Sequence, residues 1–487
     1  MKKNLVLSPL IIKGKHSLPV IQGGMGVRIS TWQCARAVAL TGGIGILSGT
    51  AIHIIIARLL QLGDPGGHLK RAFDAFPFQE TAKKMYKKYF ISQGKREDEK
   101  FRDPEMFSLS PSRELIELTV LANFAEVFLA KEGHDGIIGI NYMEKIQMPH
   151  IYSFFGAMLA GVDIVTAGAG IPIQFPSILE DLAEGKAVEY RIDVTGAAPR
   201  EFSMQFDPKD FFSPHAIPKL SKPDFFPIIS STVLAKTLAK KLLGKIKGFV
   251  IEKSLAGGHN APPRDKKSFN ERGEPIYGPK DEVDLSVIKT LGIPYILAGG
   301  YSNPEKANQA FRDGAVAIQA GTIFQYSEDS GLDPRLRSIA KSMAFQGKLD
   351  VLTSGVSPTG YPFKIALIPG TLSDPAVYVN RPRICDLGFL REPYKKEDGS
   401  VGYRCSAEPI NAYVKKGGKE EDCQDKVCLC TCLMANASLS QRRAEGYIEP
   451  PLVTSGDDTS FIHSLMSGPD DSYNVEDAIM FILGKIN

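Results

Sequence analysis

A histidine that follows two glycines is the residue of this chain best suited to acid–base chemistry. The mainly apolar run Lys247–Ile251 predicts a buried strand, and the stretch SLAGGHNAPPR follows, with Gly257 and Gly258 directly before His259. Glycine lets backbone approach another group closely, because it lacks a Cβ atom. The segment therefore either presents His259 to a ligand or is a turn in which the histidine only caps a loop.

Two later strand ends carry glycines that could cradle a phosphate group. ILAGGYSNPEKANQAF places Gly299 and Gly300 after an apolar strand, with a capping residue and a proline opening the next helix. VAIQAGTIF places Gly321 and Thr322 after the following strand. In a β/α barrel, the loops after the seventh and eighth strands commonly bind phosphate through backbone N–H groups. The paired glycines predict a phosphate-bearing ligand.

Other strand ends suit a flat heterocyclic ring. Gly23, Gly24 and Met25 in PVIQGGMGVRIS combine close-approaching backbone with a polarizable side chain. Asn141 in GINYM ends another strand, where an amide can hydrogen-bond the edge of a heterocycle. A phosphate, a planar ring and a nearby histidine together predict flavin mononucleotide (FMN) beside an acid–base residue.

Short apolar strands, mostly followed by glycine and then a helical pattern, must position these residues. Such alternation predicts a parallel sheet covered by helices, and eight repeats predict a closed (β/α)8 TIM barrel, an α/β fold. Its active site lies at the C-terminal ends of the strands. The expected strands are Pro19–Gln22, Gly45–Ser48, Gly136–Asn141, Asp163–Ala167, Phe226–Ser230, Gly248–Glu252, Tyr295–Ala298 and Ala315–Gln319.

Two segments exceed a minimal barrel. Residues 52–135, after the second strand, contain two strong helical patterns and predict a helical insertion that is either solvated or an oligomer contact. After Gly360 the strand–helix rhythm ends. We therefore predict a barrel over residues 1–360 and a mainly helical appendage over residues 361–487, which covers the barrel mouth and ends in a helix at Asn474–Lys485.

Composition excludes several function classes. The chain has 487 residues, 23% of them charged, and a formal net charge of +3, which is too balanced for an obligate nucleic-acid or membrane-surface binder. The N-terminal stretch lacks the cleavage site and uninterrupted apolar core of a signal peptide, and no apolar run is long enough to span a membrane. We expect a soluble, cytoplasmic protein.

The seven cysteines are unevenly placed, and five of them crowd residues 405–432. A chain of this length without an export signal does not fit a secreted disulfide framework. The stretch CQDKVCLCTC lacks the paired C-x-x-C spacing of structural zinc sites. We predict free or buried thiols and no metal.

Six sequence blocks, taken together and in order, resemble the nitronate monooxygenase family, formerly called 2-nitropropane dioxygenases, in a longer-chain branch. The blocks are PVIQGGMGVRIS, GINYM, AGGHNAP, ILAGGYS, IQAGT and SPTGYPF, and they span the predicted barrel from about Pro19 to Phe363. The resemblance implies a barrel that binds FMN non-covalently and oxidises alkyl nitronates with molecular oxygen.

The resemblance also implies roles for individual residues. His259 matches the catalytic histidine of the family, whereas Glu252 stands where shorter members usually have a glutamine near the flavin. Leu255 likewise replaces a frequent acidic residue. A carboxylate beside a flavin disfavours negative charge there unless the carboxylate is protonated or paired. The cofactor-binding residues expected from the strand ends and the resemblance are Gly23, Gly24, Met25, Asn141, Glu252, Gly257, Gly299, Gly300, Gln319, Ala320, Gly321 and Thr322.

A substrate-binding role is predicted for a later loop. In SGVSPTGYPFK, the side chains of Ser357, Thr359 and Tyr361 could hydrogen-bond a substrate, and Gly360 allows close approach. The alternative is an ordinary proline–glycine turn that joins the barrel to the appendage.

Three functions remain open at this point. The first is an FMN-dependent monooxygenase that converts alkyl nitronates, or also nitroalkanes, and O2 to a carbonyl compound and nitrite, with His259 as base. The second is a related FMN enzyme that uses NAD(P)H to reduce enoyl thioesters. The third is a flavoprotein subunit without catalytic activity, for which the insertion and tail would serve assembly, although the intact histidine loop argues against it.

Overall fold

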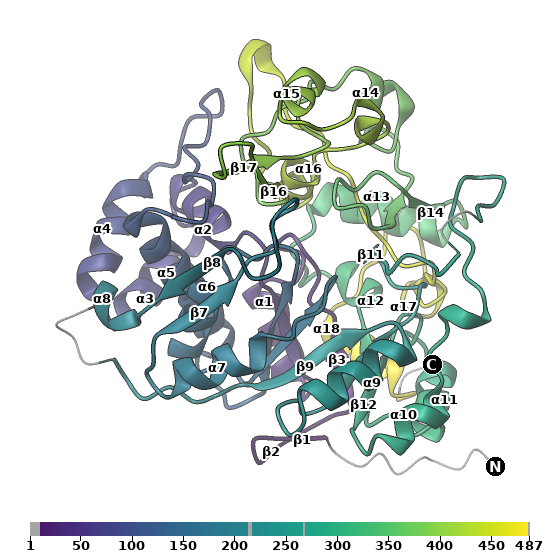
Figure 1. Cartoon of the computed structure of the whole chain (residues 1–487). Coiled ribbons are helices and arrows are strands. Elements are labelled where there is room, and N and C mark those ends of the chain that lie inside the picture. Colours follow the sequence, from purple (N-terminus) through teal and green to yellow (C-terminus); the bar gives the residue numbers. More distant parts are fainter. Residues whose placement is uncertain (1–9, 213–216, 266–267, 486–487) are drawn as a thin grey trace, which may run out of the picture.

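The computed structural model describes residues 10–212, 217–265 and 268–485, and a parallel barrel forms its centre (Figure 1). Its eight strands pair in the order β3-β13-β12-β10-β9-β6-β5-β4. A parallel bridge between Ile21 and Ile44 joins the two ends of this sheet. The barrel strands are β3 (Val20–Gln22), β4 (Gly45–Ser48), β5 (Ile138–Met143), β6 (Ile164–Gly168), β9 (Asp224–Ile229), β10 (Phe249–Glu252), β12 (Tyr295–Ala298) and β13 (Ala317–Ala320).

The predicted (β/α)8 TIM barrel is confirmed. Each of the eight expected runs is a barrel strand, with ends shifted by at most two residues. Successive side chains of a strand point to opposite faces, so half of each strand fills the barrel interior. The hairpin of β1 (Leu10–Ile12) and β2 (Lys15–Ser17) adds Ile12 to this interior cluster. The interior cluster also contains Ile21, Ile46, Ile164, Phe226, Val250 and Ile296.

A ring of helices covers the outside of the barrel. The C-terminal helix α18 (Val475–Ile482), predicted at Asn474–Lys485, contacts both α1 and α11 and so fills the ring position expected for the helix after β13. The appendage therefore returns to the barrel wall instead of ending over the mouth. The other ring helices are α1 (Trp32–Leu40), α5 (Arg113–Lys131), α6 (His150–Leu159), α7 (Phe175–Ala183), α9 (Thr232–Lys241), α10 (Leu285–Thr290) and α11 (Pro304–Arg312).

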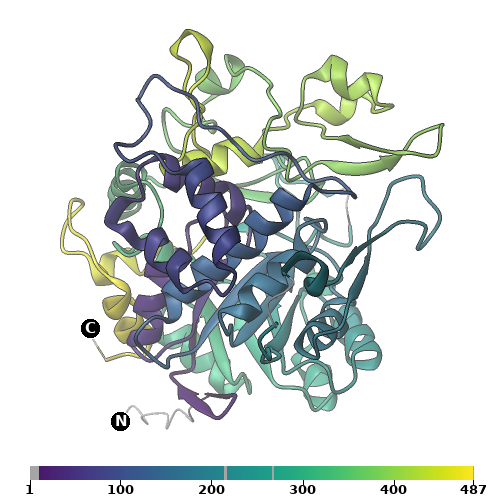
Figure 2. The ribbon, with the colours of Figure 1, turned by 90° about the vertical axis from the view of Figure 1, so that its left-hand side faces the viewer.

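The insertion at residues 52–135 is helical, as predicted, but its last helix is not solvated. In α5, 15 of the 19 residues are buried, because the helix packs between α6, α1 and the insertion helices. It is thus the crossover helix between β4 and β5, and the other insertion helices cover it (Figure 2). These are α2 (Ile52–Gln61), η1 (Pro65–Gly67), α3 (His68–Ala75) and α4 (Gln79–Tyr89).

Strands outside the barrel were not expected from the sequence. The short strand β11 (Gly258–His259) pairs with β15 (Phe363–Ala366), which pairs in turn with β14 (Val351–Ser354), all antiparallel. A division of the chain at residue 360 falls within this sheet, so the two-domain description stays a prediction. A second hairpin, β7 (Val188–Arg191) and β8 (Ser203–Phe206), leads to α8 (Pro208–Phe212).

Short helices and one hairpin make up the rest of the appendage, most of which lies on the side of the barrel opposite to β1 and β2 (Figure 1). No helix in the described ranges is both long and apolar enough to cross a lipid bilayer. The remaining elements are η2 (Pro279–Asp281), α12 (Thr322–Gln325), α13 (Pro334–Phe345), α14 (Pro375–Val379), β16 (Glu392–Lys395), β17 (Val401–Arg404), α15 (Ile410–Lys415), η3 (Glu420–Cys423), α16 (Leu429–Ala435), η4 (Ala444–Gly446) and α17 (Ile462–Leu465).

Candidate active site

A cavity of about 240 Å³ lies at the C-terminal ends of the barrel strands. The folded chain brings His259 and every predicted cofactor-binding residue to its wall, although they come from the ends of five different barrel strands. The predicted substrate residues Ser357, Thr359 and Tyr361 are not part of this wall. The predicted site residues that line this cavity are Gly23, Gly24, Met25, Asn141, Glu252, Gly257, His259, Gly299, Gly300, Gln319, Ala320, Gly321 and Thr322.

One end of the cavity, which we call the phosphate end because its glycines were predicted to cradle a phosphate group, is built from backbone. Gly299 and Gly300 both have positive φ angles, +86° and +87°, which non-glycine residues rarely adopt. A Cβ atom on Gly299 would lie 2.8 Å from the carbonyl oxygen of Lys253, and one on Gly300 would lie 3.0 Å from Leu255 Cδ1. A residue with a side chain would therefore be strained at both positions, and at Gly299 its Cβ atom would also collide with backbone.

The loop after β3 is held by Asn141. The Nδ2 atom of Asn141 donates a hydrogen bond to the carbonyl of Gly24 (3.1 Å), and its Oδ1 atom accepts one from Thr166 (2.8 Å). A Cβ atom on Gly24 would lie only 2.2 Å from Asn141 Cβ. Asn141 thus positions the Gly24 backbone, and one N–H and one lone pair of its amide remain for a ligand.

The cavity fits a flavin by two tests on its own atoms. The Oε1 atom of Gln319 is buried without a hydrogen-bond partner in the described part of the chain. Such an orphaned acceptor is costly, and a ring N–H group would satisfy it. A Cβ atom on Gly321, the second residue after Gln319, would lie 3.5 Å from the sulfur of Met25, an ordinary van der Waals distance, so the glycine leaves open space beside Met25. An unpaired acceptor and space left by a glycine are what a flat, N–H-bearing ring requires.

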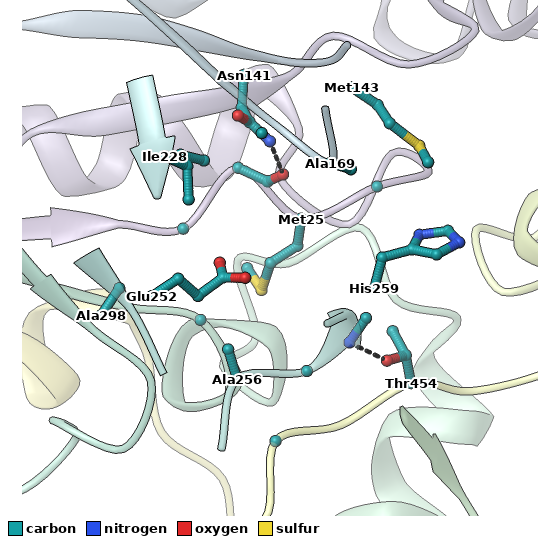
Figure 3. Close-up of a pocket in the computed structure, with 18 of the residues that line it drawn as sticks. Met25, Asn141, Met143, Ala169, Ile228, Glu252, Ala256, His259, Ala298 and Thr454 are labelled. Carbon is teal, nitrogen blue, oxygen red and sulfur yellow. Dashed lines mark hydrogen bonds between the residues drawn. The ribbon is translucent and has the colours of Figure 1, made fainter. Parts of the chain in front are cut away.

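Glu252 extends from the end of β10 into the cavity, with its carboxyl group toward Met25 (Figure 3). Burial raises the pKa of this carboxyl from 4.5 to about 7. No described residue hydrogen-bonds or pairs with the carboxyl. The carboxyl is therefore largely neutral below pH 7, which removes most of the conflict between a carboxylate and an electron-rich flavin.

His259 is held rigidly at the other end of the cavity. It pairs with Phe363 in the small antiparallel sheet, and the rings of the two residues pack edge to face, 4.7 Å apart. Its Nε2 atom lies 2.7 Å from the hydroxyl oxygen of Ser357. Burial, with a smaller contribution from the charge of Lys145, lowers the pKa of His259 to about 3. The imidazole is therefore neutral at physiological pH.

The predicted substrate residues lie behind the histidine. Ser357 is fully buried, and its hydroxyl lies 2.8 Å from the hydroxyl of Thr359 as well as close to His259. The ring of Tyr361 lies under the ammonium group of Lys145, 4.0 Å away. Ser357 therefore hydrogen-bonds His259, Thr359 hydrogen-bonds Ser357, and neither residue lines the cavity.

A segment from the appendage, residues 454–458, was missed by the sequence analysis, and we call it the strap. Thr454 Oγ1 accepts a hydrogen bond from the backbone N–H of Gly258 (2.7 Å), and the N–H of Gly456 donates to Thr322 Oγ1 (2.9 Å). A Cβ atom on Gly257 would lie 2.8 Å from the carbonyl carbon of Ser455. The close approach that Gly257 permits is therefore to the strap.

The strap also carries charge into the phosphate end. Asp458 lines the cavity, and its carboxylate lies 2.6 Å from the ammonium group of Lys306. Asp457, next to it, pairs with Lys364 at 2.8 Å. The two lysines compensate the two carboxylates, so the strap does not leave an unpaired negative charge beside the phosphate position. Nothing in the sequence pattern of residues 454–458 links this segment to glycine loops about 130–200 positions earlier.

The wall near His259 is apolar, and the appendage supplies part of it. Strand β5 and the loop after it contribute two of these side chains, and β15 contributes Phe363. The residues of this apolar wall are Met143, Ile146, Phe363, Phe389, Leu390 and Leu433.

The cysteines are free thiols, as predicted. Cys430 and Cys432 lie in a hydrophobic cluster with residues of α2 and α16, which explains their burial by packing alone. Among the residues that the structure describes, no group of three or more His, Cys, Asp or Glu side chains is arranged to hold a metal ion.

No protein-family model and no curated protein matches this sequence. Solved structures do match. FabK from Thermotoga maritima is 16% identical, with 96% of this chain and 92% of that chain covered and a TM-score of 0.48. A nitroalkane oxidase from Streptomyces ansochromogenes is 15% identical, with 72% of this chain and 76% of that chain covered and a TM-score of 0.37. The order of the eight parallel strands and the bridge that joins the two ends of their sheet show the barrel independently of these matches.

Proposed function

We propose that this chain is an FMN-dependent monooxygenase that converts alkyl nitronates and O2 to a carbonyl compound and nitrite. One observation carries the proposal: a neutral, buried histidine and a glycine-built phosphate cradle face one cavity, as the motifs shared with nitronate monooxygenases require. The motifs alone leave His259 without a geometric role, and the cavity supplies one. Substrate and O2 are the small molecules that such a site would take.

The chain's own residues bind and orient the reactants. The backbone at Gly299–Gly300 and Gly321–Thr322 would hold the phosphate of FMN, and Gln319 with Asn141 would meet polar edges of its ring. When bound, FMN would supply the electron-transfer and oxygen chemistry that no amino-acid side chain provides. The apolar wall excludes water from the reacting carbon.

His259 would act as the base when the substrate is a neutral nitroalkane. If Nε2–H donates to Ser357, the lone pair of Nδ1 is free to take a proton, and Nδ1 has no hydrogen-bond partner among the described residues. The nitronate that forms is an anion, and an anion beside the ring favours the imidazolium that burial otherwise disfavours. Toward a preformed nitronate, His259 would act only as a hydrogen-bond partner.

The apolar wall favours a second candidate, an NAD(P)H-dependent FMN reductase of enoyl thioesters. Phe389, Leu390 and Leu433 extend the apolar surface beyond what a small nitronate would cover. An acyl chain would bury this surface, at roughly 25 cal/mol for each Å² removed from water.

Anaerobic mixing of the purified protein with ethyl nitronate, NADH or NADPH separates the candidates. Bleaching of the flavin absorbance by nitronate alone supports the monooxygenase. Bleaching by NADH or NADPH but not by nitronate supports the reductase. If none of the three compounds bleaches the flavin, the result supports a flavoprotein subunit without catalytic activity. Mass spectrometry of the released chromophore tests the cofactor itself, and FAD in place of FMN would contradict the proposal.

A further inference from the structure

Glu252 lies between two cavities. One is the cofactor cavity described above. The other, which we call the side pocket, has a volume of about 190 Å³ and lies between the loops after β9 and β10. Glu252 lines both of them. The other residues that line the side pocket are Ser230, Ser231, Lys253, Ser254, Asn260, Ala261, Pro262, Arg264, Tyr277 and Asp281.

The two cavities differ in what they can hold. The cofactor cavity is walled on the histidine side by apolar residues, whereas serine, amide and charged side chains line most of the side pocket. A cavity volume of about 10–15 Å³ is enough to hold one water molecule, provided that several polar groups hydrogen-bond that water. The side pocket is polar and large enough for several water molecules. Glu252 is the ionisable residue that lines both cavities.

The charged groups around Glu252 leave its carboxyl unpaired. Lys253 lies 3.9 Å from Glu282, and the carboxylate of Asp281 accepts hydrogen bonds from the backbone N–H groups of Arg264 and Gly278. No described residue hydrogen-bonds the carboxyl of Glu252, and burial alone accounts for its raised pKa. A carboxyl with a pKa of about 7 gains and loses protons readily near neutral pH. The titratable groups that face Glu252 are Lys253, Arg264, Tyr277 and Asp281 in the side pocket and His259 and Asp458 in the cofactor cavity.

We propose that Glu252 is an acid–base residue that carries protons between the cofactor cavity and water in the side pocket. The proposal rests on the proposed function in that the proton acceptor is the flavin or the substrate in the cofactor cavity. In each transfer the O–H bond of the Glu252 carboxyl breaks and an O–H or N–H bond forms on the acceptor. The carboxylate then takes a proton from a water molecule of the side pocket, which is re-protonated from solvent. The reverse sequence exports a proton.

His259 makes such a second route necessary. Burial holds the pKa of His259 at about 3, so the imidazole is a poor place to keep a proton taken from a substrate. Its Nε2 atom lies 2.7 Å from the buried hydroxyl of Ser357, and neither His259 nor Ser357 lines the side pocket. Glu252 supplies the exchangeable site that His259 does not.

Infrared spectroscopy of the purified protein tests the proposal without turnover. We expect a carbonyl band of a protonated carboxylic acid that titrates with a midpoint near pH 7, that shifts rapidly in D2O, and that is lost in Glu252→Gln. Glu282→Gln, in the exposed neighbour, is the matched control and should leave the band unchanged. If Glu252→Gln fails to fold, Glu252→Asp should shift the same band.

Filling the side pocket separates the proton route from a merely buried acid. Ser230→Leu and Ser254→Leu narrow the side pocket without touching the cofactor cavity, so the band should remain while its exchange in D2O slows. Absence of the band below pH 6, its survival in Glu252→Gln, or unchanged exchange in both serine variants would each overturn the proposal. A protein purified without flavin would overturn the proposed function instead, because the infrared titration still reports on Glu252.

Discussion

The two ends of the cofactor cavity are built on different principles. At the phosphate end, Gly299 and Gly300 shape the site through backbone alone, with positive φ angles and no space for a Cβ. At the other end, His259 depends on side chains from residues about 100 positions away, Ser357 and Phe363. The conformation of a glycine loop is determined by a few adjacent residues. The orientation of a histidine ring, in contrast, depends on partners that only folding brings close to it.

This difference has a chemical consequence. A glycine cradle can hold a phosphate but cannot transfer a proton, whereas a cluster of side chains can do both. The cost is that burial disfavours the charged form of a titratable side chain. That cost is visible in the pKa of His259, lowered to about 3, and in that of Glu252, raised to about 7. The following predictions test whether binding and chemistry are separable between the two ends.

The largest effect is expected from His259→Asn. This change keeps a hydrogen-bond donor but removes basicity, and a positioned base contributes about 10²–10⁴-fold to proton removal from carbon. If the wild-type enzyme accepts nitroalkanes, we expect a loss of about this size on neutral nitroalkanes, with most of the turnover on preformed nitronates and all of the FMN retained. Oxygen consumption on both substrates measures it. Equal losses on both would assign the histidine to substrate binding or oxygen activation, and no loss would leave it as a turn residue.

Gly300→Val should damage the opposite end. A β-branched residue at φ +87° adds strain of about 1–3 kcal/mol and collides with Leu255, so FMN should bind about ten times more weakly or worse. Equilibrium dialysis of the released flavin measures this. Gly360→Val is the control, because Gly360 has φ +77° and open surroundings but lies outside the cavity. Full retention of FMN in Gly300→Val would contradict the claim that the backbone at Gly300 shapes the phosphate end of the cavity.

Glu252→Gln should change how stability depends on pH. The unfolded carboxyl titrates near 4.5 and the folded one near 7, so wild-type stability falls as pH rises between these values and stays lowered above pH 7. The variant lacks this loss, so the difference between its free energy of unfolding and that of the wild type should grow in favour of the variant by about 3 kcal/mol across that window. Urea unfolding at several pH values checks the sign. A constant difference between the two proteins would contradict the raised pKa.

Ser357→Ala should give the smallest effect. Loss of one hydrogen bond to the ring costs about 0.5–1.5 kcal/mol, which predicts a fall of several-fold in turnover of nitroalkanes with little change in FMN binding. A positioning role also predicts a changed ratio of the two His259 tautomers, which nitrogen NMR of the ring measures. Thr359→Val, one hydroxyl further from the ring, should change that ratio less. An unchanged ratio in Ser357→Ala would assign Ser357 to packing.

The local sequence pattern was sufficient to predict the barrel strands but not how the insertion and the C-terminal helix pack around them. All eight strands were predicted because each is a short apolar run and most of them end at a glycine. A parallel strand that is buried on both faces shows this apolar pattern whichever strands it pairs with. The insertion was expected to be a solvated addition or an oligomer contact, but α5 is buried within the helical ring. The length of the segment predicted an addition to the barrel, but not which of its helices packs against the barrel, and even Glu117 and Glu126 of α5 are buried there. No local pattern could assign α18 to the barrel wall.

The sequence by itself determined the barrel, the glycine cradle and the place of His259 at a strand end, because those features depend on residues within a few positions of one another. Only the tertiary structure decided which groups surround them. The strap enters the cavity because Thr454 and Gly456 find backbone and hydroxyl partners in loops far away in the chain. Ser357 changed from a predicted substrate contact to a partner of the histidine, since burial and hydrogen bonding are set by what packs against a residue.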